Sequence, residues 1–406
     1  MSIRTSTKFS KLVMLIQLLC LSPLILIIIL IYPILKIKIF ELETRAIGHS
    51  SLTIEIFLSE INNNIYDFKR NIILYYSNDI IANKLLFNKW KKIFSKQTVK
   101  FYCIPSTILR PIFLLFKLLG LKIFLAPYRH WTDNFFWQRA DIHNVLSKTK
   151  PNINFDKLEN RIGIDYLKKN QISDDKKYIC AIFRNSEYYN DSNNSRNVGV
   201  NNSLNAIKFF TNKGYKVFLM GGVNLKKNQI LKKTTKIIDY SNSQLKTELL
   251  DLYLLFNSKF NICADTGLRD IPYMNRKPVA LNNFASLEII PLEDTLATTT
   301  FFIPKKYYSI NNNQYVKFSK VFELKLYKKN ILELKEMGYE IVENSNDEIL
   351  NLWKETESLI KNNFKREPLD RNNKKFRKIY QDYFGYDIQN LRLTKQFLKK
   401  NYKLIN

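Results

Sequence analysis

Short apolar runs alternate with amphipathic stretches between residues 178 and 281, and this pattern predicts strands and helices alternating in a parallel α/β sheet. The apolar runs predict strands over 178–183, 216–220, 236–239, 260–264 and 278–281. Helices are expected over 203–212, closed by Lys213-Gly214, and over 245–257. Crossovers between parallel strands are right-handed, so the carboxyl ends of these strands should share one edge of the sheet.

The residues before this region show the same alternation less regularly. Strands are predicted over 38–43 and 71–76. Between them, Ser50 or Ser51 is the expected N-cap of a helix that ends near Asn62. Helical and apolar segments are expected after the second strand.

Two further stretches complete the pattern. Residues 152–170 form a polar connection with a short helix, which predicts a domain boundary near residue 170. From residue 314 on the pattern is mostly helical, and the polar run 343–348 precedes and caps an amphipathic helix over 349–361.

The first 37 residues predict a membrane anchor. Residues 12–35 carry no charge, and a helix needs only about 20 apolar residues to span a bilayer. The run is too long for the apolar core of a signal peptide. Pro23 and Pro33 leave an interfacial, kinked anchor open as an alternative. A second apolar and basic stretch, 108–128, is either an interfacial helix or a core helix with snorkelling lysines.

Charge and composition limit the chemistry. A net charge of +28 favours anionic partners, namely a membrane surface, nucleotides or nucleic acid. The four cysteines and three histidines are too scattered for a disulfide framework or a metal knuckle, and no Asp-x-Asp pair is present to hold a divalent cation. We therefore expect no metal and a reducing, cytoplasmic environment for the body of the chain. The sequence also lacks the glycine-rich nicotinamide fingerprint, the Walker motif and the serine nucleophile elbow.

The stretch Asp265-Thr266-Gly267-Leu268 follows the predicted strand 260–264 and opens a short helix. A helix N-terminus presents unpaired N–H groups and the positive end of a dipole, and a glycine lets the backbone approach a phosphate closely. Ligands of open α/β sheets bind outside the carboxyl ends of the strands. These four residues are therefore candidates for binding a phosphate-bearing ligand, and the alternative is an ordinary turn capped by Asp265 or Thr266.

Three more candidates are expected at the same sheet edge. Arg184 and Asn185 follow the strand 178–183, and Gly221 follows the strand 216–220. A guanidinium at this position can hold a diphosphate through two parallel hydrogen bonds. The alternative for Arg184 is an exposed surface arginine.

Loop residues near that edge are weaker candidates. Arg196 and Asn197 lie in the loop after the strand 178–183 and could reach the same ligand, although an ordinary polar loop is the default. Asp239 could accept hydrogen bonds from a ribose or a base, but such an aspartate more often caps a turn.

His49 and Glu55 are the candidates for catalysis. His49 follows the first predicted strand, and Glu55 lies in the next helix. A neutral histidine at such a turn can act as the general base for an acceptor hydroxyl, because its pKa lies near the working pH. Glu55 is the alternative base, and a capping or packed histidine is the alternative for His49.

The order of these motifs resembles a family of bacterial glycosyltransferases associated with surface-polysaccharide gene clusters. The resemblance spans nearly the whole chain and begins with the apolar N-terminus running into Arg45-Ala46-Ile47-Gly48-His49 and Glu55. Its clearest segments are Ile238-Asp239-Tyr240-Ser241, Asp251-Leu252-Tyr253-Leu254, Ala264-Asp265-Thr266-Gly267-Leu268 and Arg276-Lys277-Pro278-Val279. The turn at Asp265 is further similar to the donor-site turn of heptosyltransferase-like enzymes. In one respect the chain departs from the family, because Ile182 stands where members often carry a histidine.

The resemblance implies a GT-B-like α/β fold, with two Rossmann-like domains facing a cleft. Its parts would be a membrane anchor (1–37), an acceptor-side domain (38–170), a nucleotide-sugar-binding domain (171–312) and a helical C-terminal extension (313–406). The implied activity is metal-independent transfer of a sugar from a nucleotide diphosphate sugar, as co-substrate, to a hydroxyl of a lipid-linked glycan. No other cofactor is implied.

The expected location is the inner membrane, with the catalytic body on the cytoplasmic side and the basic surface against anionic lipid. Two alternatives remain. One is a non-catalytic nucleotide-sugar-binding or scaffold component of a polysaccharide assembly system. The other is nucleic-acid binding, which the charge alone suggests and which is not expected because no nucleic-acid motif is present.

Overall fold

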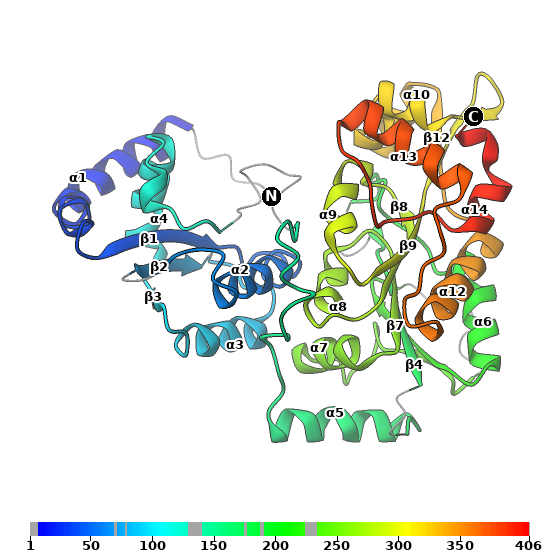
Figure 1. Cartoon of the computed structure of the whole chain (residues 1–406), viewed down its shortest axis with the longest axis horizontal. Coiled ribbons are helices and arrows are strands. Elements are labelled where there is room, and N and C mark those ends of the chain that lie inside the picture. The colour runs from blue at the N-terminus through cyan, green and yellow to red at the C-terminus, as the bar shows by residue number, and fades with distance from the viewer. Residues whose placement is uncertain are drawn as a thin grey trace. The chain divides into compact units, whose positions relative to one another are not determined.

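The computed structural model describes residues 7–68, 71–77, 79–128, 140–173, 177–186, 191–223 and 234–405. The chain divides into two compact units, residues 1–134 and 135–406 (Figure 1). Both units contain a parallel sheet with helices packed against it.

The first unit holds a three-stranded parallel sheet in the order β1-β2-β3. Its elements are α1 (Thr7–Ile31), β1 (Lys36–Leu42), α2 (Leu52–Asn62), β2 (Asn71–Ser77), α3 (Lys84–Phe94), β3 (Lys100–Cys103), α4 (Ser106–Leu118) and the 3-10 helix η1 (Lys122–Phe124). The first two predicted strands and the helix between them are confirmed. The strand β3 was not predicted, because its Lys100-Phe101-Tyr102-Cys103 sequence is short and mostly exposed and so lacks a buried apolar run.

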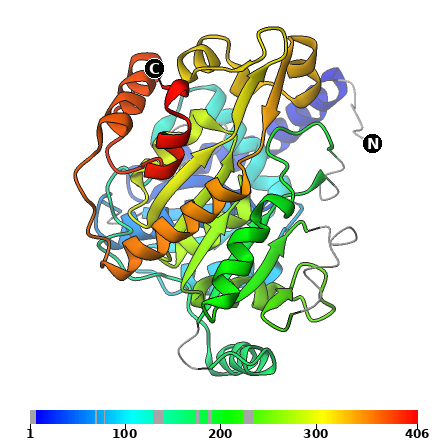
Figure 2. The same ribbon diagram turned by 90° about the vertical axis from the view of Figure 1, so that its right-hand side faces the viewer.

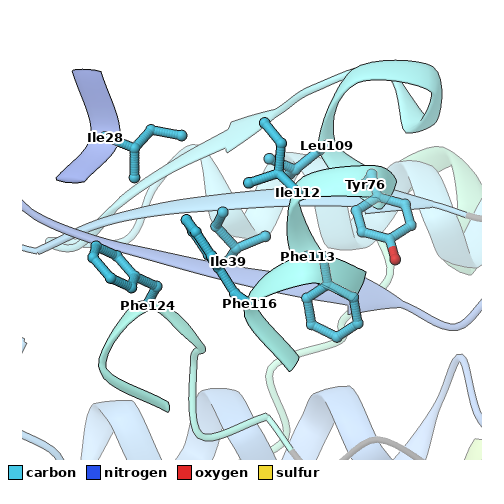
Figure 3. Packing of buried hydrophobic residues seen from close by; sticks show 8 residues of the cluster. All are labelled: Ile28, Ile39, Tyr76, Leu109, Ile112, Phe113, Phe116 and Phe124. Carbon is cyan, nitrogen blue, oxygen red and sulfur yellow. The ribbon is translucent and has the colours of Figure 1, made fainter. Parts of the chain in front are cut away.

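Strand β1 is buried on both faces, because successive side chains of a strand point to opposite sides. On one face, Ile39 packs in a cluster with Ile112 and Phe116 of α4 and with Ile28 of α1 (Figure 3). On the other face, the ring of Phe40 lies 5.5 Å from that of Phe57 in α2. The apolar alternation of β1 thus fixes α1 and α4 on one side of the sheet and α2 on the other.

Helix α1 combines a long apolar surface with little packing. Its segment Val13–Ile31 has a mean hydropathy of 2.9 and is 6% buried, which makes it long and apolar enough to cross a membrane. Residues 108–128 were expected to form either an interfacial helix or a core helix. The face of α4 that carries Leu109 and Ile112 is packed in the core of the first unit. The end of that helix differs, because Leu118 is 79% exposed.

The second unit is built on six parallel strands in the order β6-β5-β4-β7-β8-β9. These strands are β4 (Tyr178–Phe183), β5 (Lys216–Gly221), β6 (Ile237–Asp239), β7 (Phe260–Cys263), β8 (Val279–Phe284) and β9 (Thr299–Pro304). Counted from β4, the order is 3-2-1-4-5-6, which is that of a Rossmann fold. Five strands lie where the sequence predicted them, and β9 was not predicted.

Helices cover both faces of this sheet (Figure 1). They include α5 (Lys157–Lys169), η3 (Asn201–Ser203), α6 (Leu204–Asn212), α7 (Glu248–Asn257), η5 (Gly267–Arg269), α8 (Asp270–Met274), η6 (Leu287–Ile289) and α9 (Ile290–Thr295). The two units divide at residue 134, so α5 belongs to the second unit, whereas the sequence placed it before a boundary at residue 170. The packing explains this position, because a Cβ at Gly163 of α5 would overlap the ring of Tyr253 in α7.

The last hundred residues are part of the second unit and pack against its six-stranded sheet and α6. They comprise β10 (Lys306–Ser309), β11 (Gln314–Tyr315), α10 (Phe318–Glu323), η7 (Leu326–Lys328), α11 (Ile331–Glu336), β12 (Tyr339–Val342), α12 (Asn346–Lys361), α13 (Arg371–Phe384), α14 (Lys395–Lys400) and η8 (Tyr402–Leu404). The predicted helical extension therefore also contributes two strands, in an antiparallel sheet of order β11-β10-β12. Helix α12 (orange) lies beside α6 (green) in Figure 2, with the rings of Trp353 and Phe210 5.4 Å apart.

Candidate functional site

The carboxyl ends of β4, β5 and β7 bring predicted residues to one edge of the six-stranded sheet. Arg184 follows β4, Gly221 ends β5, and Asp265 lies two residues beyond β7. Since β4 pairs with both other strands in parallel, their ends are neighbours. The strand order reverses direction between β4 and β7, which is where open α/β sheets bind their ligands. The predicted gathering of these residues at one sheet edge is therefore seen in the structure.

Asp265 lies at the centre of a buried ion-pair network. Its side chain is 1% exposed, and its Oδ1 accepts a hydrogen bond of 2.6 Å from Nη1 of Arg269. Its Oδ2 accepts a hydrogen bond of 2.9 Å from the backbone N–H of Ser286. Burial alone would raise the pKa of Asp265, but the charges of Arg196 and Arg269 hold it well below its usual range. The carboxylate is thus ionised and fixes the turn from inside.

Arg269 was missed by the sequence analysis. Its guanidinium is buried, lies 2.9 Å from Glu293 through Nη2 and stacks over the ring of Phe284 at 5.4 Å. Glu293 in turn accepts a hydrogen bond of 2.7 Å from the hydroxyl of Tyr273. The only local signal was the spacing of four residues from Asp265, because Glu293 reaches the network through the packing of α9.

The residues after Asp265 remain accessible. Thr266, Gly267 and Leu268 are each partly exposed, and Gly267 opens η5, which continues directly into α8. The predicted turn into a short helix is confirmed. Among the four residues of this motif, Asp265 is buried and the other three are partly exposed.

Arg196 also contacts the turn at Asp265. Its Nε donates a hydrogen bond of 3.1 Å to the carbonyl oxygen of Asp265 and lies 3.4 Å from the Oδ1 of that residue. The side chain is 35% exposed, so it is the cation nearest to solvent in this network. The loop of Arg196 and Asn197 therefore does reach the turn at Asp265.

Lys305 is a second residue that the sequence analysis missed. It follows β9, is 3% exposed, and its Nζ donates a hydrogen bond of 2.5 Å to the carbonyl oxygen of Asn197. Burial lowers the pKa of Lys305, while the charges of Glu343 and Asp265 act in the opposite direction. It could not be identified beforehand because its strand was not predicted.

Gly221 and Asn185 have a packing explanation. Gly221 has a φ of +77°, and a Cβ there would overlap the carbonyl oxygen of Phe183. A Cβ at Gly222 would likewise overlap the side chain of Asn185. The two glycines thus let the end of β5 lie directly against the end of β4. Arg184, beside them, is 9% exposed and accepts a hydrogen bond of 2.8 Å from Val198 through its backbone carbonyl.

Asp239 caps a turn in this structure. Its carboxylate accepts hydrogen bonds from the backbone N–H of Asn242 at 3.3 Å and from the side-chain amide of Asn242 at 2.9 and 3.0 Å. This is the turn-capping alternative that the sequence left open for Asp239.

His49 and Glu55 lie in the first unit. His49 is partly exposed in the segment between β1 and α2, whereas Glu55 lies in the first turn of α2 with 0% exposure. A general base must reach the proton that it removes. Between the two predicted bases, His49 is therefore the one that solvent reaches in this structure. Within the described residues, no group of three or more His, Cys, Asp or Glu side chains is placed to hold a metal ion.

No protein-family model matches the sequence, and no curated protein matches it. Among solved structures, the chain is similar to the glycosyl transferase family 9 from Veillonella parvula DSM 2008, at 11% identity and a TM-score of 0.39, over 61% of this chain and 80% of that one. It is also similar to the E. coli ADP-heptose LPS heptosyltransferase II, at 12% identity and a TM-score of 0.35, over 60% and 84%. The UDP-GlcNAc 2-epimerase from Neisseria meningitidis matches at 10% identity and a TM-score of 0.30, over 81% and 100%. With TM-scores below 0.5, none of these likenesses decides the activity of this chain.

Proposed function

We propose that this chain is a membrane-associated glycosyltransferase. It moves a sugar from a nucleotide diphosphate sugar to a hydroxyl of a surface glycan, which is lipid-linked, and it needs no metal. The donor binds at the carboxyl edge of the six-stranded sheet, and His49 or Glu55 in the first unit removes the proton of the acceptor hydroxyl. The sequence resemblance described above supports this reading.

The observation that carries the proposal is the gathering of cations and backbone turns at the switch point between β4 and β7. Arg184 and Arg196 lie in the connection after β4, and Lys305 follows β9. Arg196 contacts the carbonyl oxygen of Asp265, just before Thr266 and Gly267, and Lys305 contacts the carbonyl oxygen of Asn197, next to Arg196. A leaving nucleotide diphosphate concentrates negative charge, which fixed donors and guanidinium groups stabilise when they are aimed at it. Such an edge offers this stabilisation without a metal.

The membrane part of the proposal rests on α1. Its segment Val13–Ile31 is apolar and 6% buried, and the chain as a whole carries a net charge of +28. An apolar helix beside basic residues favours an anionic membrane surface, where a lipid-linked acceptor would be presented. We place the catalytic body on the cytoplasmic side of the inner membrane, where nucleotide sugars and reduced cysteines are found.

A non-catalytic nucleotide-sugar-binding or scaffold role is the second candidate. One observation favours it, namely the side chain at position 182. Ile182 lies in β4, is 1% exposed and can neither donate nor accept a hydrogen bond through its side chain. Whatever the histidine does in the resembling family is absent at this position.

The test uses the full-length protein in detergent with a panel of nucleotide diphosphate sugars and EDTA. We expect one donor to raise the melting temperature and to be hydrolysed slowly, and we expect Arg196→Gln to abolish both effects. Arg161→Gln is the matched control, because Arg161 is 81% exposed on α5 and far in sequence from the turn. Binding without turnover, even with membrane extract as the acceptor source, would favour the scaffold role. A folded protein that responds to no donor would contradict both candidates.

A further inference from the structure

A pocket lies beside the edge strand β9. It has a volume of about 420 Å³. It is lined by Phe301 of β9, by α12 from Asn351 on, by the segment that connects α12 to α13, by Asn373 of α13, and by Arg392, Leu393, Lys395 and Gln396. Pockets of a few hundred Å³ are typical of sites for small molecules. This one is formed entirely by the second unit.

Two arginines are held in fixed positions at this pocket. Arg366 donates hydrogen bonds to the carbonyl oxygens of Asn390 at 2.8 Å and of Thr299 at 2.6 Å. Arg392 donates a hydrogen bond of 2.5 Å to the carbonyl oxygen of Glu367. Because these bonds are to backbone carbonyls, they orient both guanidinium groups without neutralising their charges.

The carboxylates around the pocket are engaged elsewhere. Glu355 accepts hydrogen bonds from the backbone N–H groups of Lys395 and Gln396 at 3.0 and 3.2 Å, and so caps α14. Asp370 caps α13 through the N–H groups of Asn372 and Asn373 at 3.0 and 2.9 Å. None of these contacts involves either arginine.

Five basic and three acidic side chains line the pocket, so its wall carries a net positive charge. Among the described residues, no carboxylate oxygen lies within 4.0 Å of the guanidinium nitrogens of Arg366 or Arg392, and the buried Nε of Arg392 has no hydrogen-bond partner. Burial, and then the charge of Arg392, lower the pKa of Arg366 to about 10, with Asp294 acting in the opposite direction. Two partly buried like charges are stabilised by a bound anion.

We propose that this pocket binds a phosphorylated sugar, with the phosphate between Arg366 and Arg392. A guanidinium pair matches the geometry and the double charge of a phosphate better than a single lysine would. The volume exceeds that of a phosphate ion, and Asn351, Asn362 and Gln396 on the wall offer amide groups to sugar hydroxyls. The concave shape favours a small molecule over an extended polyanion.

This site is separate from the proposed donor site. Arg366 contacts Thr299, the first residue of β9, whereas Lys305 of the donor edge follows the last residue of the same strand. The pocket therefore lies toward the amino end of β9, and the donor edge lies at the carboxyl end. The two proposals stand on different residues, so either can fail alone.

The test is calorimetric titration of the full-length protein with glucose 1-phosphate and, separately, with inorganic phosphate. We expect glucose 1-phosphate to bind more tightly than phosphate, and Arg392→Gln to weaken its binding about tenfold or more, as is typical for loss of a charge-assisted hydrogen bond. The control Lys378→Gln removes one exposed charge from α13 outside the pocket and should leave the Kd unchanged. Arg196→Gln should also leave it unchanged.

Ser358→Phe is a second variant that spares the arginines. Ser358 is exposed on α12 and lines the pocket, so a bulky ring there should block binding without disturbing the fold. No binding of glucose 1-phosphate, or equal affinity for both anions, would overturn the proposal. It would also fail if binding survived both Arg392→Gln and Ser358→Phe, or disappeared only with Arg196→Gln.

Discussion

Glu288 should make the second unit less stable as the pH rises. This residue lies in η6, just after β8, and its buried Oε2 has no hydrogen-bond partner among the described residues. Burial, together with the nearby charge of Asp265, raises the pKa of Glu288 to about 7, while a backbone hydrogen bond and the charges of Lys328 and Arg196 act in the opposite direction. The tyrosines of this region, Tyr307, Tyr327 and Tyr380, interact with the same carboxyl group.

The magnitude follows from linkage between proton binding and folding. The folded state holds the proton of Glu288 up to about pH 7, whereas the pKa of a free glutamate is 4.5. The stabilisation from this proton is fully present below pH 4.5 and is lost as the pH rises to about 7. Each pKa unit corresponds to about 1.4 kcal/mol, so the loss has an upper limit of about 3 kcal/mol.

The experiment compares the wild type with Glu288→Gln by differential scanning fluorimetry at pH 4.5, 6, 7 and 8. Glutamine keeps the shape but cannot ionise, so the variant should gain stability relative to the wild type as the pH rises. At about 2–4 °C for each kcal/mol, the difference in Tm should grow from near zero at pH 4.5 to several degrees at pH 8.

The control is Glu340→Gln, which removes an exposed carboxylate from β12. That variant should show no comparable growth of the Tm difference. A difference for Glu288→Gln that stays constant with pH, or a variant that is less stable than the wild type at pH 8, would refute the reasoning.

Three further outcomes are expected. Asp265→Asn should destabilise the second unit by about 3–5 kcal/mol in urea titration, because it leaves a buried guanidinium short of a partner; a loss below about 1 kcal/mol would count against the ion-pair network. Gly163→Ala should cost about 1–3 kcal/mol, because its Cβ would overlap the ring of Tyr253. Gly199→Ala is its control, since a Cβ there meets open space, and equal effects of the two would disprove the packing argument. Deleting α1 should move the protein from the membrane to the supernatant on fractionation, and continued sedimentation with washed membranes would contradict the anchor.

The sheet of the second unit could largely be predicted from sequence because its central strands are buried on both faces. Strands such as β4 are continuous apolar runs, and such a run between turn residues is a strong local signal. The strand β9 escaped because it lies at the edge of its sheet, where Leu393 from the last part of the chain forms its outer contact. The local sequence of residues 299–304 does not indicate that this strand pairs with Leu393, which is almost a hundred residues away.

For the candidate site, the sequence predicted where the strands end and turn, but not which buried side chains pair there. The turn at Asp265 and the shared edge with Arg184 follow from the strand pattern, since parallel strands end together. The buried partners could not be found in this way, because Glu293 lies 2.9 Å from Arg269 in space but far from it in sequence. For Asp239 the sequence could not separate two roles, because an aspartate at the end of a strand has the same sequence pattern whether it binds a ligand or caps a turn.

The depth of the charges at the proposed donor edge decides whether an anion can bind there. The network contains several carboxylates, which by themselves would repel a diphosphate. Asp265 and Glu293 are, however, 0–1% exposed and held inward by Arg269, whereas Arg196 is 35% exposed. Coulomb interactions weaken with distance and are screened by solvent. An approaching anion therefore comes closest to the guanidinium of Arg196, whose attraction is stronger than the repulsion from the more distant, buried carboxylates. Arg269 thus has a positioning role: by holding Asp265 in the interior, it leaves Arg196 able to serve an anion at the surface of the edge.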